Sequence, residues 1–186
     1  MTNKTLYDTK FLQLKSTPSK SGNEWVYAHR PNASNVVVIL PIIDNEKILF
    51  LKEERPPLAA EGIGKYSIAI PAGLVGDERK GETTLEAIKS ELLEETGLEA
   101  DKIIIKTKVV ASSPGCVSET CTIAFAYINN STVTTPPIDD GGVIVERILV
   151  DKTNIFNWLK EQEAEGYILT GQTLAALFYL FEKENI

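Results

Sequence analysis

The chain has 186 residues, of which 43% are hydrophobic and 24% are charged, the composition of an ordinary soluble globular protein. This length is typical of one domain, with at most a small appendage. With 19 basic and 26 acidic residues the net charge is −7, and such a surface repels nucleic acid and anionic membranes. An anionic substrate would therefore need a local positive group, either arginines or a metal ion.

The cysteine and histidine content excludes several kinds of site. The only cysteines are Cys116 and Cys121 and the only histidine is His29, too few for a zinc site, so we interpret the cysteines as reduced thiols. The N-terminus lacks the apolar core of a secretory signal, and no apolar run is long enough to span a bilayer. We therefore expect a cytoplasmic protein that binds neither nucleic acid nor membrane.

The first predicted element is an N-terminal β arm. Residues 9–30 contain two short segments of extended character around a polar turn rich in serine, proline and glycine. This segment is apolar enough to pack against something but lies outside the main pattern of the chain. We assign the arm to residues 1–34 and the main domain to residues 35–186.

The main domain alternates apolar strands with turn residues and three helices. Strands are predicted at 36–43, 47–54, 66–73, 103–112, 120–128 and 143–150, and the third of them ends in a Pro-Ala-Gly break. One helix follows that break, and two more, roughly 152–165 and 171–184, close the chain. This order predicts an α/β (α+β) fold, a mixed sheet sandwiched between helices.

The central helix has clear start and stop signals. Thr83 and Glu86 fit a capping box at its start, and Gly97 fits a C-terminal stop. Leu85, Ile88 and Leu92 are predicted to form the stripe that faces the core.

The same helix carries Glu91, Glu94 and Glu95 on one turn. Like charges at these spacings repel, and the helix dipole disfavours negative charge near a C-terminus. A solvated face is the usual interpretation of a charge run, but such a face normally interleaves lysine or arginine at this spacing. A divalent cation such as Mg²⁺ or Mn²⁺ would remove both costs, because these ions prefer carboxylate oxygens.

These glutamates belong to a longer spaced pattern, Gly76-x5-Glu82-x7-Ser90-Glu91-Leu92-x-Glu94-Glu95-x-Gly97-Leu98. It resembles the Nudix box, G-x5-E-x7-R-E-U-x-E-E-x-G-U, in which U is a bulky aliphatic residue. Every fixed position agrees except Ser90, which replaces arginine. A pattern with this many fixed positions is highly specific.

The flanking segments resemble the ADP-ribose pyrophosphatase (ADP-sugar diphosphatase) branch of the Nudix hydrolase family. The segments that carry this likeness are Trp25-Val26-Tyr27-Ala28-His29-Arg30, Glu54-Arg55-Pro56-Pro57, Ile70-Pro71-Ala72-Gly73-Leu74, Ser113-Pro114-Gly115 followed by Glu119, and Thr170-Gly171-Gln172-Thr173-Leu174. Together they cover nearly the whole chain. The resemblance implies the Nudix fold and a Mg²⁺-dependent (or Mn²⁺-dependent) hydrolysis of an ADP-sugar to AMP and a sugar phosphate.

The resemblance also implies residue roles at the metal. Glu91 and Glu95 would ligate metal ions, Glu94 would bind directly or through water, and the carbonyl of Ala72 would add a ligand. Glu119 would orient or deprotonate the attacking water, with the box glutamates Glu91 and Glu94 as the alternative base. Glu119 taken alone would be interpreted as a solvated loop carboxylate.

For the substrate, the resemblance implies that Arg55 holds a phosphate with help from Arg30, and that Trp25 stacks on the nucleobase. Taken alone, Arg55 would be a surface residue and Trp25 a core or interface aromatic. In this branch the arm is exchanged between subunits, which implies a homodimer with composite active sites.

Departures from the family pattern leave alternatives open. Ser90 cannot supply charge, so metal affinity or rate would fall unless another cation substitutes. Ala69 stands where the branch often has a glutamate. Gly76 satisfies the strict count of the box but Gly73 has the matching context, so the backbone ligand is Ala72, which we favour, or Val75 in the other register.

Other functions also remain open at this stage. The same reaction on another nucleoside diphosphate sugar or on a dinucleotide is one. A weakly active or inactive Nudix-fold module that binds a nucleotide for regulation is another, although the intact set of glutamates argues against it.

Overall fold

The computed structural model describes residues 3–77, 79–129 and 143–182. The described strands are β1 (Lys4–Asp8), β2 (Gln13–Pro18), β3 (Glu24–His29), β4 (Asn35–Ile43), β5 (Lys47–Glu54), β6 (Tyr66–Ala69), β7 (Ala72–Val75), β8 (Lys102–Ala111), β9 (Thr120–Ile128), β10 (Ile144–Asp151) and β11 (Ile168–Leu169). The described helices are α1 (Pro56–Ala60), α2 (Thr84–Thr96), α3 (Ile155–Ala164) and α4 (Gly171–Phe181). None of these described helices is long and apolar enough to cross a membrane.

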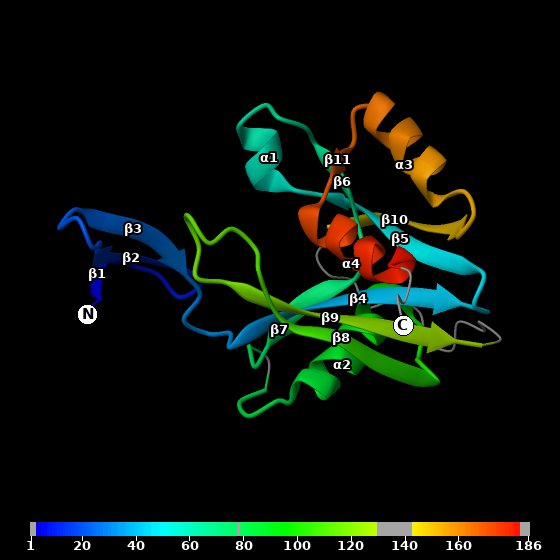
Figure 1. Cartoon of the computed structure of the whole chain (residues 1–186), viewed down its shortest axis with the longest axis horizontal. Coiled ribbons are helices and arrows are strands. Elements are labelled where there is room, and N and C mark those ends of the chain that lie inside the picture. Colours follow the sequence, from blue (N-terminus) through cyan, green and yellow to red (C-terminus); the bar gives the residue numbers. More distant parts are fainter. Residues whose placement is uncertain (1–2, 78, 130–142, 183–186) are drawn as a thin grey trace.

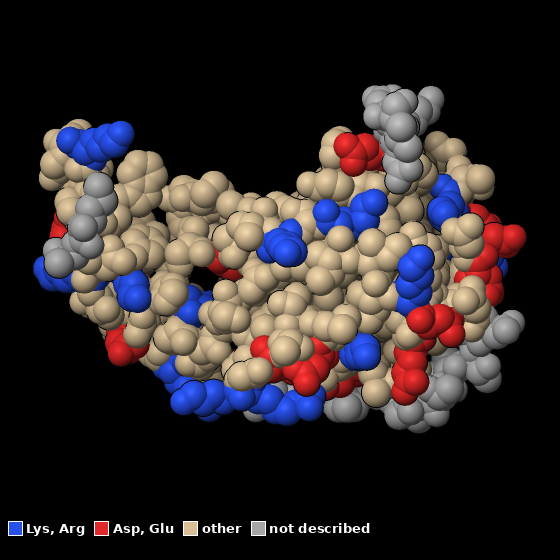
Figure 2. Space-filling model, turned by 60° about the horizontal axis from the view of Figure 1, so that its bottom comes forward, with Lys and Arg blue, Asp and Glu red and all other residues tan. Residues whose placement is uncertain are grey.

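The N-terminal strands form a sheet of their own. β1, β2 and β3 pair antiparallel in that order, and this sheet extends to one side of the main body (Figure 1). The two extended segments expected in the arm are β2 and β3, whereas β1 was not predicted. In the space-filling view the surface is hollowed between the arm and the main domain (Figure 2). The boundary at residue 34 stays a prediction.

The main domain is built on one eight-stranded mixed sheet, with β11-β6-β5-β4-β9-β8 as its path. β4 runs parallel to β9 and β11 runs parallel to β6, while the other neighbours are antiparallel. α2 packs on one face through Ala87, Ile88 and Leu92, whereas α3 and α4 cover the other face through Ile155, Leu159, Ala176 and Leu177. The predicted mixed sheet between helices is confirmed.

The sheet splits beside the hairpin that joins β4 and β5. The turn at this hairpin has positive φ values of 49° at Asp44 and 59° at Asn45, a backbone that short polar residues tolerate. The two strands pair only next to this turn. Farther along, β4 pairs with β7, and β5 pairs with β6 and β10. The chain crosses this split from β6 to β7 at residues 70–71, so the predicted strand 66–73 is two short strands.

α2 begins and ends as predicted. The Thr83 hydroxyl accepts the Glu86 N–H and the Glu86 carboxylate accepts the Thr83 N–H, while Gly97 ends the helix at a φ of 73°. The prediction that Leu85 faces the core is wrong, since its side chain is 44% exposed. The first turn of α2 contributes no buried residue, and burial begins at Ala87.

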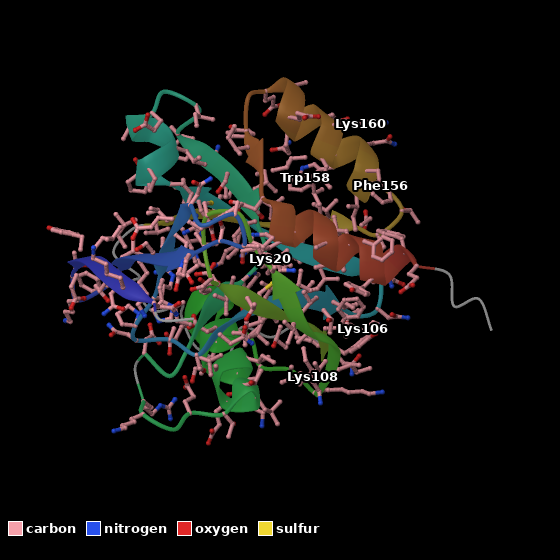
Figure 3. The ribbon with its side chains drawn as sticks, turned by 60° about the vertical axis from the view of Figure 1, so that its left-hand side comes forward. Lys20, Lys106, Lys108, Phe156, Trp158 and Lys160 are labelled. Carbon is pink, nitrogen blue, oxygen red and sulfur yellow. The ribbon has the colours of Figure 1, made fainter. Side chains whose placement is uncertain are left out.

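Aromatic side chains of α3 pack against the sheet and against α4 (Figure 3). Trp158 lies against Phe50 of β5 with ring centroids 4.8 Å apart and packs against the buried core. Phe156 contacts Phe181 of α4 at 4.9 Å. The short elements α1 and β11 were not predicted.

Candidate active site

Two of the predicted metal ligands on α2 meet the backbone of β7. The Ala72 N–H donates to Oε2 of Glu95 at 3.1 Å. The carboxylate of Glu91 fills the space beside Gly73, where a Cβ would lie only 1.8 Å from its Cδ. Only glycine permits this close approach of side chain and strand. Glu91, Glu95 and Ala72 are therefore in one place, at the split in the sheet.

A further carboxylate, which was not predicted, lies at this split. Glu53 on β5 is only 2% exposed, and its Oε2 accepts a hydrogen bond from Nη2 of Arg55. Its strand neighbour Leu51 pairs with Ala69, the position where the branch often carries a glutamate. Glu53 thus places a carboxylate on the strand next to Ala69. The alternation Leu49, Leu51, Glu53 on the buried face of the strand could have revealed it.

The pKa of the Glu95 carboxyl is strongly raised. Burial first, and then the negative charges of Glu53 and Glu91, raise its pKa from 4.5 to about 8. The Ala72 N–H and Arg55 oppose this shift. The carboxyl groups of Glu53, Glu91 and Glu95 therefore lie close together where little water reaches them. A bound cation would favour their ionised forms.

These donors fit a Mg²⁺ or Mn²⁺ ion, which takes a few carboxylates and completes its shell with water and substrate oxygens. Within the part of the chain that the structure describes, no three carboxylate, imidazole or thiol groups already surround one point. Glu53, Glu91 and Glu95 thus lie near one another without forming a complete coordination shell. Glu94 lies half-buried on the same helix.

The helix end beneath these glutamates is stabilised by a cation. Nε of Arg147, on β10, donates to the backbone carbonyl of Glu95 at 2.6 Å. Carbonyls of the last helical turn have no partner within the helix, and positive charge is favourable there. Arg147 therefore offsets part of the dipole cost of placing acids at this end.

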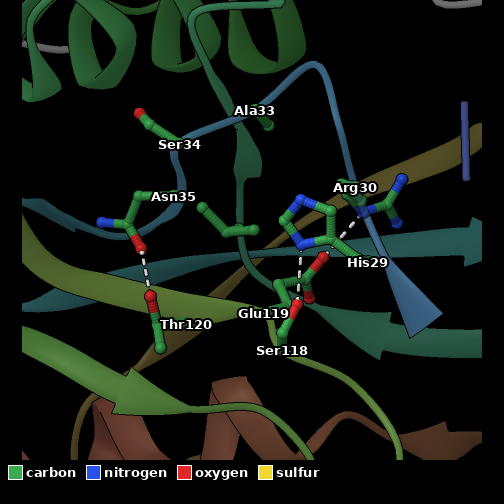
Figure 4. A pocket seen from close by; sticks show the side chains of 9 residues that line it. His29, Arg30, Ala33, Ser34, Asn35, Ser118, Glu119 and Thr120 are labelled. Carbon is green, nitrogen blue, oxygen red and sulfur yellow. Dashed lines mark hydrogen bonds and ion pairs between the residues drawn. The ribbon is translucent and has the colours of Figure 1, made fainter. Parts of the chain in front are cut away.

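A second group of residues lies around Glu119 (Figure 4). Nε of Arg30 donates to Oε2 of Glu119 at 2.7 Å, and the Ser112 hydroxyl donates to Oε1 at 3.3 Å. In the same small pocket, Nδ1 of His29 and the Ser118 hydroxyl are 2.9 Å apart. Burial, followed by the charge of Lys15, lowers the pKa of His29.

This second group is held together by contacts between the arm and the loop before β9. Trp25 donates its indole N–H to the carbonyl of Gly115 at 2.8 Å, and its side chain is half-exposed. The Ala28 N–H donates to the Cys116 carbonyl, and the Ser118 N–H donates to the Ala28 carbonyl. Arg30 therefore contacts Glu119 directly, and Trp25 is bonded to the same loop at Gly115.

The two groups flank β4. Val36 of this strand pairs with Leu74 of β7 on one side and with Cys121 of β9 on the other. Glu91, Glu95, Ala72 and Arg55 belong to the first group, whereas Trp25, Arg30 and Glu119 belong to the second.

Each of the two candidate glycines of the Nudix box, Gly73 and Gly76, has its own physical reason to be glycine. Gly73 allows the approach of Glu91, whereas Gly76 has a φ of 91° that other residues rarely adopt. The Val75 carbonyl already accepts the backbone N–H of Ser34 at 3.1 Å and its hydroxyl at 3.3 Å. This supports Ala72 over Val75 as the backbone ligand.

Ser90, the departure in the box, has an arginine beside it. Nη2 of Arg79 donates to the Ser90 hydroxyl at 2.9 Å and lies 3.7 Å from Oε1 of Glu82. Oε2 of Glu82 in turn accepts the Gly76 N–H at 3.1 Å. The loop between β7 and α2 therefore places the positive charge of Arg79 beside the helix turn that precedes Glu91.

The α/β/α sandwich with a glutamate-bearing helix over a split sheet defines a Nudix-type fold. The crystal structure of an ADP compounds hydrolase matches 98% of this chain and 91% of that chain, with a TM-score of 0.71 and 19% identity. This likeness confirms the expected fold.

A relative that is 30% identical establishes the family, and a second one is similar. An uncharacterized Nudix hydrolase of Schizosaccharomyces pombe is 30% identical over 156 residues, which are 78% of this chain and 71% of the relative. A Caenorhabditis elegans protein provisionally named nudix hydrolase 2 is 24% identical over 162 residues, 81% of this chain and 69% of that protein. No family model matches the chain. The chain belongs to the Nudix hydrolase family, so the expectation of a hydrolase is confirmed.

Proposed function

We propose that the chain hydrolyses the pyrophosphate bond of ADP-ribose or a related ADP-sugar, giving AMP and a sugar phosphate. The observation that carries this proposal is the convergence of Glu91 and Glu95 on the β7 backbone at Ala72 and Gly73. The likeness to an ADP compounds hydrolase and the flanking segments of the ADP-sugar branch support the ADP-sugar as substrate.

The residues proposed to hold the metal are Glu91, Glu95 and the carbonyl of Ala72, with Glu94 binding directly or through water. A Mg²⁺ or Mn²⁺ ion bound there neutralises the pyrophosphate and lowers the pKa of a water molecule. The chain must ionise Glu95 for this, and the Ala72 N–H stabilises the ionised carboxylate. Arg147 keeps the helix end that carries these groups in place.

Glu119 is proposed to accept the proton of the attacking water, with Glu91 or Glu94 as the alternative base. The water oxygen forms a bond to one phosphorus as the bridging P–O bond breaks, and the bridging oxygen leaves with the other phosphate. Arg30 and Ser112 fix both oxygens of the Glu119 carboxylate, so its orientation is set before substrate binds. A proton acceptor must lie within hydrogen-bond reach of the water, which makes this orientation important.

Arg55 is proposed to bind a substrate phosphate. Its side chain is 45% exposed while its partner Glu53 is buried, so the guanidinium is anchored on one side and open on the other. A guanidinium has several N–H donors in one plane, and one bond to Glu53 leaves others for phosphate oxygens. Arg30 would assist, and the half-exposed ring of Trp25 would stack on the nucleobase.

A homodimer with composite active sites is part of this proposal. The arm exposes large apolar side chains by 41–69%, namely Leu6, Tyr7, Phe11, Leu12, Leu14, Trp25 and Val26. Apolar patches of this kind mark contact surfaces. A second copy of the chain is the proposed partner, because the same arm already carries Trp25 and Arg30.

A substrate panel tests the proposed reaction. The purified protein with Mg²⁺ is incubated with ADP-ribose, ADP-glucose, GDP-mannose and dinucleotides, and AMP or GMP release is followed. We expect the fastest release of AMP from an ADP-sugar, with ADP-ribose giving AMP and ribose 5-phosphate. Faster GMP release, or faster cleavage of a dinucleotide, would show that the preferred substrate is not an ADP-sugar. No turnover of any compound, with nucleotide binding that survives Glu95→Gln, would instead favour a regulatory binding module.

A further inference from the structure

Arg79 connects the loop of residues 76–82 to α2. Its Nη2 donates to the Ser90 hydroxyl at 2.9 Å and faces Oε1 of Glu82 at 3.7 Å. The Glu82 side chain is only 5% exposed, so a cationic neighbour and the Gly76 N–H lower the cost of its burial. Arg79 thus contacts Glu82, at the end of the segment that leads from β7 into α2, and Ser90 on the helix itself.

We infer that Arg79 is a positioning residue that supplies from the loop the positive charge that Ser90 lacks, and that it keeps α2 in register with β7. This inference rests on the proposed metal site, because its effect is on the donors of that site. Ser90 directly precedes Glu91, and Glu94 lies one turn farther on the same side of the helix.

The need for such a device follows from the tight fit between α2 and β7. Glu91 lies against Gly73 with no room for a methyl group, and Glu95 is bonded to the Ala72 N–H. A small slide of the helix along the strand would break both contacts. Functional groups must be held within about 0.5 Å by their supporting residues.

The direct covalent link between β7 and the start of α2 is the loop that Arg79 fastens. Within this loop Gly76 has a positive φ of 91° and Gly81 one of 87°, two positions that turn the chain sharply. The Gly76–Glu82 bond closes the loop on itself, and the Arg79–Ser90 bond fastens it to the middle of the helix. An arginine suits this task, since its planar fork serves two acceptors at once.

The first experiment measures Mn²⁺ affinity without any nucleotide, by the loss of the free-ion electron paramagnetic resonance signal. Arg79→Ala is compared with Lys80→Ala, which removes the neighbouring exposed cation of the same loop. We expect Arg79→Ala to weaken Mn²⁺ binding by about tenfold, the smaller end of the effects of outer partners, because Arg79 is largely exposed. Lys80→Ala should change it by less than about twofold. Equal affinities in the two variants would overturn the inference.

The second experiment moves the arginine from loop to helix. The double variant Arg79→Ser with Ser90→Arg keeps one guanidinium at this place, and we expect its Mn²⁺ affinity to return to within about threefold of the unaltered chain. A residue with a purely structural role would show no such rescue, so failure of the swap contradicts the inference. Thermal unfolding of each variant is measured, and if Arg79→Ala does not fold, Arg79→Gln replaces it.

The outcomes separate this inference from the proposed reaction. If the affinity falls and the swap restores it while no ADP-sugar is hydrolysed, the positioning role stands and the proposed function fails. If ADP-sugars are hydrolysed but Arg79→Ala leaves the Mn²⁺ affinity unchanged, the proposed function stands and the positioning role fails.

Discussion

A methyl group at Gly73 would overlap the carboxylate of Glu91, since a Cβ built there lies 1.8 Å from Cδ of Glu91. We expect Gly73→Ala to push this side chain away from β7, weakening Mn²⁺ binding by about tenfold or more. Crowding in a packed place also costs about 1–3 kcal/mol of the free energy of unfolding. Isothermal titration with Mn²⁺ and urea unfolding measure the two effects.

Gly171→Ala is the matched control for this prediction. A Cβ at Gly171, the first residue of α4, meets nothing within 4 Å, so neither quantity should fall. Equal Mn²⁺ affinity in Gly73→Ala and Gly171→Ala would show that Glu91 does not need its contact with the strand to serve the metal site.

Some of the residues at the split in the sheet could be predicted from the sequence, whereas others could not. Glu91 and Glu95 were expected from the spaced pattern and Ala72 from its Pro-Ala-Gly context, and the contacts of Ala72 and Gly73 bring them together. Glu53 and Arg79 were missed. Their roles depend on partners that the fold brings close. The partner of Glu53 is Glu95 on α2, and the partner of Arg79 is Ser90 at the other side of the loop.

Among the elements, α2 carries a pH dependence of stability through Glu95. The pKa of this carboxyl is about 8 in the folded chain and 4.5 ordinarily. Between these values the unfolded chain has lost a proton that the folded chain keeps, so the folded state is increasingly disfavoured as pH rises. The free energy of unfolding of the metal-free protein should therefore fall from about pH 5 to about pH 8, by at most about 1.4 kcal/mol per pH unit from this group.

Urea unfolding with a chelator at several pH values measures this slope. Glu95→Gln removes the titrating group, so the difference in slope between the two proteins isolates it. Saturating Mg²⁺ should flatten the slope of the unaltered chain, since the ion favours the ionised carboxylate. Parallel curves for the unaltered chain and Glu95→Gln would rule out the raised pKa.

The elements with strong local signals were predicted well, and the short ones were not. α2 has a capping box and a stop glycine, and the long strands have β-branched apolar runs, so neighbours in the chain specify them. β1, α1 and β11 contain between two and five residues each and depend on their partners. The break between β6 and β7 was expected as a strand end, because only the pairing of β7 with β4 shows that the chain continues.

For the molecule as a whole, the exposed apolar arm predicts self-association. We expect a dimer in sedimentation equilibrium at micromolar concentration, and we expect the double variant Tyr7→Asp with Phe11→Asp to be monomeric. These side chains are 67% and 69% exposed, so their loss should not unfold the chain itself. Lower turnover in the monomeric variant would support composite sites, whereas a monomeric unaltered chain with full activity would contradict both expectations.

The surface of the whole molecule also bears on the substrate. Basic and acidic side chains are interspersed over the face shown in Figure 2, and the chain carries a net charge of −7. Such a surface does not by itself attract a pyrophosphate. The proposed chemistry therefore depends on local positive charge, from Arg55, Arg30 and the metal held by the glutamates of α2.

The most direct test of this chemistry is Mg²⁺-dependent release of AMP from ADP-ribose by three proteins: the unaltered chain, Glu95→Gln and Glu99→Gln. Glu99 is an exposed glutamate just beyond the end of α2 and serves as the matched control. We predict that Glu95→Gln lowers kcat by about a hundredfold or more, while Glu99→Gln stays within about twofold. Equal turnover in the two variants, or AMP release that persists without a divalent ion, would contradict the proposal.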